Sequence, residues 1–204
     1  MHLQNQPKKN RENEKLSDRS ILSYISGLRV ILYFFMERGY VKQFSIELPK
    51  AEKKVRDTYT PSELELLLKK PDLKTCSFSE YRNWVLINYF LSTANRLSTA
   101  LNLKIQDLNF DEDEIILRAV KNRRQYILPM DKWLKKILIE YLSYRKGAPE
   151  DYVFCKASDS SKPLSRNGMQ QAISSYNLSR GVSRTGGHIF RNYYAKNYLL
   201  TRRF

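Results

Sequence analysis

Residues 91–130 read LSTANRLSTALNLKIQDLNFDEDEIILRAVKNRRQYILPM, and within this stretch the hydrophobic spacing changes from helical to strand-like. After a break at Thr93-Ala94-Asn95, a short helix is predicted from Ser98 to about Lys104. Three β-like runs then follow, separated by Asp111-Glu112-Asp113 and Lys121-Asn122-Arg123-Arg124: Ile105–Phe110, Glu114–Val120 and Gln125–Leu128. The stretch therefore predicts a small antiparallel meander within an otherwise helical chain.

Helices are predicted on both sides of this meander, because apolar residues recur there at spacings of three and four. They run from Ser17 or Asp18 to Gly39, over Pro61–Lys69 and Glu80–Leu91, from Asp131 to about Arg145, from about Ser165 to Tyr176, and onward from near His188. The helix after Asp131 is expected to carry Trp133 on its apolar face. The predicted fold class is mainly α with a small three-stranded antiparallel sheet (α+β).

A polar, Lys-rich stretch from Lys50 to Asp57 separates the first predicted helix from the rest. It is followed by Thr60-Pro61-Ser62-Glu63, in which Thr60 and Glu63 have the spacing of a capping box and Pro61 suits a first helical turn. A linker followed by a new helix is typical of a domain boundary. The sequence therefore predicts two parts, residues 1–56 and 57–204.

The chain is strongly basic, with 36 Lys+Arg against 21 Asp+Glu among 204 residues and a formal net charge of +15. After Asp159 there are basic side chains and no acidic one. A charge of this size attracts polyanions, most often nucleic acid and less often an anionic membrane surface. Hydrophobic residues make up 42% of the chain, which excludes a disordered basic tail and indicates a folded protein.

Neither a secreted nor a metal-binding protein is indicated. The two cysteines, Cys76 and Cys155, are far apart and have neither disulfide-framework nor zinc-site spacing. The first twenty residues lack the apolar core of a secretion signal, and no stretch approaches the about 18 apolar residues of a membrane span. We therefore expect a soluble, cytoplasmic protein with no membrane partner.

Three separated basic elements occupy positions that secondary structure would hold in place. Arg96 lies at a break between helices, Lys121 at a turn between strands, and His188 and Arg191 open a helix three residues apart. That spacing puts both side chains on one face near the positive end of the helix dipole, where a phosphate is favoured. Taken singly, each has a structural alternative: capping or surface exposure for Arg96, a solvated loop tip for Lys121 and an N-cap for His188.

In this order the elements resemble the tyrosine recombinase (phage integrase) family, whose members break and rejoin DNA strands. Arg96 begins RLSTALNLKIQDL, which is similar to the family's R-(I/L)-S-E-(A/L)-L-x-L-x-x-x-D-(I/L) segment. Lys121 resembles its β-turn lysine before an apolar-Pro ending, and His188-Ile189-Phe190-Arg191 resembles its H-x-L-R box. The resemblance implies a catalytic domain of the DNA breaking-rejoining fold over 57–204, preceded by a partial helical core-binding (SAM-like) segment in 1–56.

The resemblance also implies the role of each residue. Arg96 and Arg191 would clamp the scissile phosphate and stabilise the charge that develops in the transition state. Lys121 would give a proton to the leaving 5′ oxygen, and His188 would position the phosphate and assist proton transfer at the nucleophile. The chemistry needs no metal and no other cofactor.

Further expectations concern partners. Arg123 and Arg124, in the basic turn after Lys121, are expected to contact DNA. The implied partners are double-stranded DNA and other recombinase subunits assembled on it. A salt-dependent affinity for DNA is expected, because phosphate contacts release counterions.

The chain departs from the family pattern at both ends. The family places its nucleophilic Tyr a few tens of residues beyond the H-x-x-R box, whereas few residues follow Arg191, and Tyr193, Tyr194 and Tyr198 fall in the same predicted helix as Arg191. The nucleophile is therefore not identified. The first helices of a core-binding domain are not recognised either, so the sequence predicts a recombinase truncated at the C-terminus and short at the N-terminus.

Two supporting positions also differ from the family. Thr99 stands where an acidic residue is usual, and Asn192 where His is frequent. The leading hypothesis is thus an integrase fragment that approaches DNA and does not cleave it unaided. One alternative is a noncatalytic DNA-binding module that occupies a site or regulates a full-length recombinase. Another is a basic helical protein such as an RNA-binding scaffold.

Overall fold

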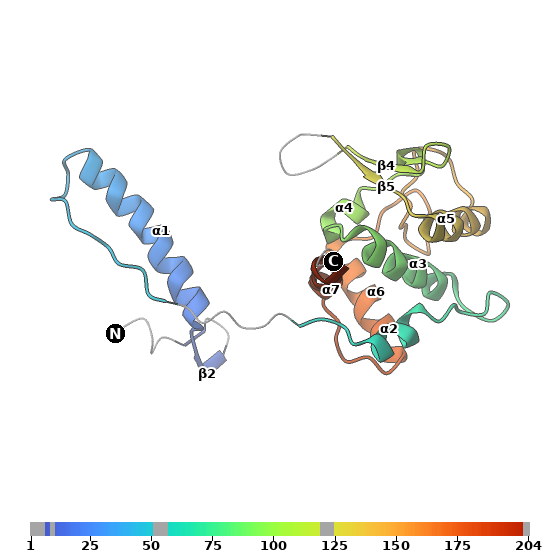
Figure 1. Cartoon of the computed structure of the whole chain (residues 1–204), viewed down its shortest axis with the longest axis horizontal. Coiled ribbons are helices and arrows are strands. Elements are labelled where there is room, and N and C mark those ends of the chain that lie inside the picture. Colours follow the sequence, from blue (N-terminus) through green and yellow to red (C-terminus); the bar gives the residue numbers. More distant parts are fainter. Residues whose placement is uncertain (1–6, 9–10, 51–56, 119–124, 202–204) are drawn as a thin grey trace. The chain divides into compact units, whose positions relative to one another are not determined.

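The computed structural model describes residues 7–8, 11–50, 57–118 and 125–201. The chain divides into two compact units, Met1–Val55 and Arg56–Phe204, which we call the N-terminal and C-terminal units. Figure 1 shows the elements of each unit. The described part contains seven α-helices and a three-stranded antiparallel sheet, as the fold class predicted.

The N-terminal unit consists of a small hairpin and one long helix. Strands β1 (Pro7–Lys8) and β2 (Arg11–Lys15) pair antiparallel, a feature that the sequence did not predict. Helix α1 (Asp18–Glu37) begins where the side chain of Ser17 accepts from the Ser20 N–H, at 3.2 Å. It is followed by Gly39 at φ +73°, a left-handed conformation that stops helices. The predicted first helix is therefore confirmed.

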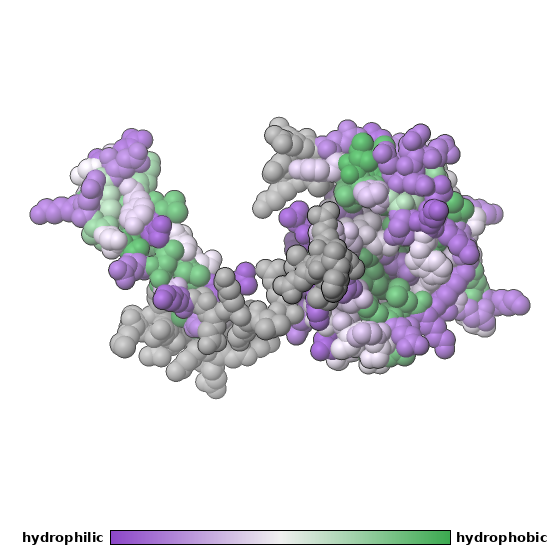
Figure 2. Space-filling model, in the orientation of Figure 1, coloured by the Kyte–Doolittle hydropathy of each residue, from purple (hydrophilic) through white to green (hydrophobic). Residues whose placement is uncertain are grey.

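Helix α1 exposes much of its apolar surface, which Figure 2 shows as green patches along the helix. Among the described residues, it is the one helix long and apolar enough to cross a membrane by length and composition. The expectation that no stretch approaches a membrane span was wrong in this respect. The expectation was based on uninterrupted apolar runs. The mean hydropathy of α1 is high even though the helix contains polar residues such as Arg29. The core helix of a soluble protein passes the same test, so this property assigns no membrane.

The C-terminal unit is built around one buried helix. Its helices are α2 (Pro61–Leu68), α3 (Phe78–Thr93), α4 (Leu97–Leu101), α5 (Lys132–Arg145), α6 (Arg166–Ser179) and α7 (Gly187–Thr201). Figure 1 shows α3 at the centre, with α5 on one side and α6 and α7 on the other. Every residue of α3 from Tyr81 to Phe90 is buried, as expected of a helix that is apolar on most of its surface.

The capping signals identified in the sequence fix several helix starts. Thr60 and Glu63 form the predicted capping box at the start of α2, with Pro61 in its first turn. The Asp131 side chain accepts from the Leu134 N–H at 2.8 Å and begins α5. Short polar side chains thus satisfy backbone donors that no helical carbonyl reaches.

The sheet has the predicted meander order, β3–β4–β5, with all pairs antiparallel. Its strands are β3 (Leu108–Asn109), β4 (Glu114–Leu117) and β5 (Tyr126–Pro129), and Ile115 of β4 pairs with Leu108 on one side and Leu128 on the other. The first predicted strand was too long, because residues Ile105–Asp107 form a 3₁₀ turn. The buried Asp107 carboxylate accepts from the Lys104 N–H and pairs with Arg118 at 2.6 Å, which holds that turn.

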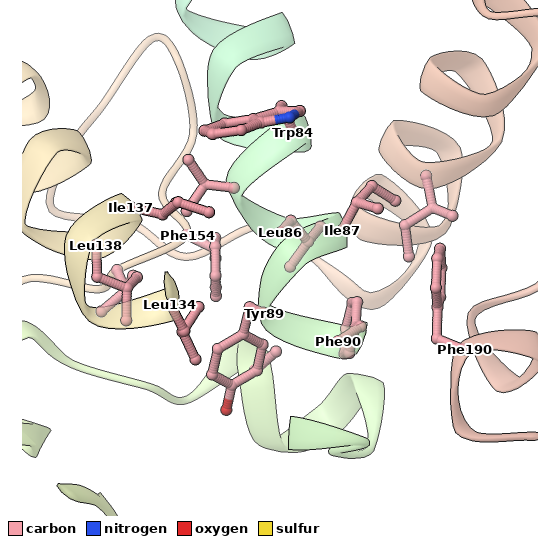
Figure 3. Close-up of a cluster of buried hydrophobic side chains, with 14 of the residues drawn as sticks. Trp84, Leu86, Ile87, Tyr89, Phe90, Leu134, Ile137, Leu138, Phe154 and Phe190 are labelled. Carbon is pink, nitrogen blue, oxygen red and sulfur yellow. The ribbon is translucent and has the colours of Figure 1, made fainter. Parts of the chain in front are cut away.

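The hydrophobic core lies on both sides of α3, as Figure 3 shows. Leu134 and Leu138 of α5 pack beside Phe154 on one side, and Phe190 of α7 lies near Phe90 on the other, with ring centroids 5.9 Å apart. The prediction for Trp133 was wrong: this side chain is 59% exposed and donates its indole N–H to Asn88. The core fixes α7 against α3, and thereby the loops at their ends.

Candidate functional site

A pocket of about 680 Å³ opens where α4, α6 and α7 begin. Its lining residues are Arg96, Leu97, Ser98, Arg166, Gln170, Gln171, Ser174, Thr185, Gly186, Gly187, His188 and Arg191. These described lining residues include three guanidinium groups and one imidazole, and no carboxylate. The N-terminal turn of α7, a helix of 15 residues, adds a positive dipole end. The lining therefore suits an anion.

Arg96 and Arg191 come from segments far apart in the sequence, and a tight turn brings them together. Ala94 ends α3 in the left-handed region, at φ 50° and ψ 24°, and Arg96 then precedes the first residue of α4. The Nη1 of Arg191 donates to the carbonyl oxygen of Ala94, at 2.6 Å. Desolvation and the nearby Arg96 charge both lower the pKa of Arg191. An anion between the two guanidinium groups would relieve this repulsion.

His188 is the second residue of α7 and is exposed at the pocket. Its ring lies over Gly186, since a Cβ atom built on Gly186 would be 2.6 Å from the His188 Cε1. His188 is not the N-cap considered as its structural alternative, because α7 already begins at Gly187. The imidazole and the Arg191 side chain therefore share one helix and one pocket.

A buried hydrogen-bond network holds the loop before α7. Asn177 is fully buried, and its Nδ2 donates to the Arg184 carbonyl oxygen at 2.6 Å and to the Tyr59 hydroxyl at 2.9 Å. Burial raises the pKa of Tyr59 to about 12, and its hydroxyl remains a donor toward the same carbonyl at 3.4 Å. The Arg184 side chain pairs with Glu63 at 2.5 Å. The loop is thus tied to the start of the C-terminal unit.

The same region contacts the residues on either side of Arg191. The ring of Tyr59 packs against Phe190, with centroids 4.8 Å apart. The Nδ2 of Asn192 donates to the Asp57 carbonyl oxygen, at 3.1 Å. Residues 57–63 therefore help to set the position of the helix turn that carries Arg191.

The structure brings together three of the residues that the sequence singled out. Arg96, His188 and Arg191 line one pocket. Lys121, Arg123 and Arg124 fall in the sequence between β4 and β5 and lie outside the described residues.

The contribution of α6 was missed by sequence reasoning. Arg166 and Gln170 lie one helical turn apart and line the pocket, yet they match no motif, and only their spacing of four could have drawn attention to them. Among the described residues, no group of three His, Cys, Asp or Glu side chains is placed to hold a metal ion. The described tyrosines do not line the pocket either.

Comparison with known proteins identifies the family of this chain. The profile described as "Phage integrase family" matches residues 58–201. A tyrosine recombinase of Pseudothermotoga lettingae is 25% identical over 158 residues, which cover 76% of this chain and 53% of the relative. Tyrosine recombinase XerC of Bacillus licheniformis is 27% identical over 198 residues, covering 90% and 62%. The chain thus spans about half to three fifths of the length of these relatives.

Solved structures share the fold. The Tn1549 transposon integrase (residues 82–397), in complex with circular intermediate DNA, has a TM-score of 0.69 at 19% identity, covering 93% of this chain and 69% of that one. The lambda integrase (residues 75–356) bound to DNA has a TM-score of 0.64 at 14% identity, covering 91% and 66%. With the profile match over most of the chain, these likenesses establish that the chain belongs to the phage integrase family, that of the tyrosine recombinases.

Proposed function

We propose that this chain carries the phosphate-binding side of a site-specific recombinase or integrase, which breaks and rejoins DNA strands through a tyrosine nucleophile. The observation that carries the proposal is that Arg96, His188 and Arg191 line one pocket whose described lining residues include no carboxylate. Phosphoryl transfer builds negative charge on the nonbridging oxygens, and fixed guanidinium groups stabilise it best. The relatives named as tyrosine recombinases support the same reaction class.

In this proposal each residue acts on one part of the scissile phosphodiester. Arg96 and Arg191 clamp the nonbridging oxygens, and the bond from Arg191 to the Ala94 carbonyl keeps that guanidinium aimed at the pocket. His188 positions the phosphate and assists proton transfer at the nucleophile. Lys121 gives the leaving 5′ oxygen its proton, while Arg123 and Arg124 contact the DNA backbone. No metal or other cofactor takes part.

The proposal also assigns a role to each of the two parts of the chain. Residues 1–56 would be a helical core-binding segment that contacts DNA together with the linker, and 57–204 the catalytic domain. Its partners would be double-stranded DNA and other recombinase subunits on the same DNA. Such a protein would act in the compartment that holds the DNA, which is the cytoplasm in bacteria.

We further infer that the 204 residues do not by themselves form a covalent link to DNA. Tyr193 packs against the core, and the rings of Tyr194 and Tyr198 stack on each other with centroids 6.3 Å apart. None of the three belongs to the pocket lining. An alternative that fits this geometry is a noncatalytic DNA-binding module that occupies a site or regulates a full-length recombinase.

A nicked suicide duplex tests the reaction. The chain should bind the duplex, with an affinity that falls as salt rises, and should leave no covalent adduct on a denaturing gel. The Arg96→Gln and Arg191→Gln variants should bind more weakly. An adduct that disappears when Tyr193, Tyr194 or Tyr198 is replaced by Phe would overturn the assignment of these tyrosines to packing. Absence of DNA binding by the wild-type chain would overturn the proposed function itself.

A further inference from the structure

The pocket extends beyond the three residues that the proposed function uses. At about 680 Å³ it falls within the range that accommodates whole small-molecule ligands, so it has room beyond a single phosphate group. The additional wall is one face of α6, where Arg166, Gln170 and Ser174 follow each other at intervals of four residues. This wall is made of side chains that donate hydrogen bonds.

Arg166 differs from most arginines of the C-terminal unit in having no acceptor among the described residues. The other arginines described in residues 57–201, apart from Arg96, donate to a carboxylate, a side-chain amide or a backbone carbonyl: Arg82, Arg118, Arg145, Arg180, Arg184 and Arg191. Arg96 and Arg166 both line the pocket. The guanidinium groups without an internal acceptor are therefore those that face the proposed ligand.

The charge around Arg166 also favours an anion. Arg166 is the first residue of α6, so its side chain leaves the helix at the positive end of the dipole. The same pocket contains Arg96 and Arg191 and, among its described lining residues, no carboxylate that would neutralise them. A guanidinium group in this setting binds phosphate oxygens with charge-assisted hydrogen bonds.

We infer that Arg166, assisted by Gln170, forms a second phosphate subsite in this pocket. This inference rests on the proposed function and adds to it a contact with a neighbouring phosphate of the DNA strand whose scissile phosphate lies between Arg96 and Arg191. A contact to a neighbouring phosphate fixes the register of the strand without reading its sequence. Arg166 is therefore a positioning residue.

The salt dependence of DNA binding tests this subsite on the full chain. Binding of several duplexes of unrelated sequence is measured by fluorescence anisotropy over a salt series for the wild type, Arg166→Gln and Arg166→Lys. Lys132→Gln is the matched control, because Lys132 is also the exposed first residue of a 14-residue helix and does not line the pocket. Thermal unfolding confirms that the variants are folded.

The subsite predicts that Arg166→Gln weakens binding of every duplex about tenfold at low salt. Its slope of log affinity against log salt should become shallower by about 0.9 relative to Lys132→Gln, since one phosphate contact is lost. Arg166→Lys keeps the charge and should keep most of the slope.

Three outcomes would overturn the subsite. Arg166→Gln behaving like Lys132→Gln would reject it and leave the proposed function standing. Weaker binding of some sequences only, with an unchanged slope, would show that Arg166 contacts a base edge instead. Failure of the wild type to bind any duplex would reject the proposed function and the subsite together.

Discussion

The side-chain amide of Asn177 donates to the carbonyl oxygen of Arg184 at 2.6 Å, from a position that is fully buried in α6. This carbonyl lies four residues before His188, in the loop that leads into α7. The same amide donates to the Tyr59 hydroxyl at 2.9 Å. One buried side chain thus joins the start of the C-terminal unit to the loop that lines the pocket.

We predict that Asn177→Ala lowers the free energy of unfolding by about 2–4 kcal/mol. The substitution leaves the Arg184 carbonyl with only the longer Tyr59 bond and opens a space beside it, and buried polar groups without full partners are costly. Urea unfolding measures the change. Asn167→Ala, at an exposed site in the same helix, is the control and should stay within about 0.5 kcal/mol of the wild type. Equal effects of the two substitutions would contradict a role for the network.

The second prediction concerns acid and the Glu63 carboxylate. The Thr60 backbone N–H lowers the pKa of Glu63 below its ordinary value of 4.5, desolvation opposes this, and the Arg184 guanidinium lowers it further. Because the folded pKa is depressed, the stabilisation is present above pH 4.5 and is lost as pH falls through the folded value. Glu63→Gln should therefore have a lower Tm than the wild type at pH 7.

The difference in Tm between Glu63→Gln and the wild type should narrow as the pH falls below 4.5 and through the lowered pKa of Glu63, because the wild-type side chain then becomes neutral, as Gln is at every pH. Glu65→Gln, in the same helix at an exposed position, serves as the control and should follow the wild type at every pH. A Tm difference that stays constant between pH 7 and pH 3 would mean that the charge of Glu63 contributes nothing.

Local chemistry explains why much of the fold could be predicted from the sequence. Ser17, Thr60 and Asp131 each cap a helix by accepting from the N–H three residues on, which is a property of neighbouring residues. The first strand was predicted too long because Asp107 pairs with Arg118, eleven residues away, and no local sequence pattern indicates that pair. Trp133 was misplaced because an apolar residue at the edge of a helical stripe faces solvent when its neighbours fill the core.

The residues of the candidate site also differ in whether the sequence could identify them. Arg96, His188 and Arg191 could be found because each belongs to an ordered motif, and the structure places them around one pocket. Arg166 could not be found from the sequence, because its position at the pocket depends on how α6 packs against α3 and α4. Packing of helices distant in sequence is decided by the whole core rather than by any short segment.

A third prediction follows from the conformation of Ala94. Its φ of 50° lies in the left-handed region, which is unfavourable for a residue with a Cβ and easy for glycine. Ala94→Gly should raise the free energy of unfolding by up to about 1 kcal/mol, as measured by urea unfolding, and should keep the Arg191 bond, since that bond uses the backbone carbonyl. Ala94→Val, β-branched at the same angle, should lower it. A higher free energy of unfolding for Ala94→Val than for Ala94→Gly would contradict the backbone strain at this turn.

The last prediction separates the geometry of the pocket from the stability of the fold. A Cβ atom at Gly186 would lie 2.6 Å from Cε1 and 2.8 Å from Nδ1 of His188, so Gly186→Ala must displace the imidazole. The ring can rotate toward solvent, and the free energy of unfolding should change by less than about 1 kcal/mol. The affinity for duplex DNA should nevertheless fall several-fold.

The chain has two histidines, so the Cε1–H resonance of His188 reports the displacement directly. Ser143→Ala, at an exposed position of α5 outside the pocket, is the control and should leave both the resonance and DNA binding unchanged. An unshifted His188 resonance in Gly186→Ala, or a loss of affinity as large in Ser143→Ala, would contradict the placement of the imidazole in the binding pocket.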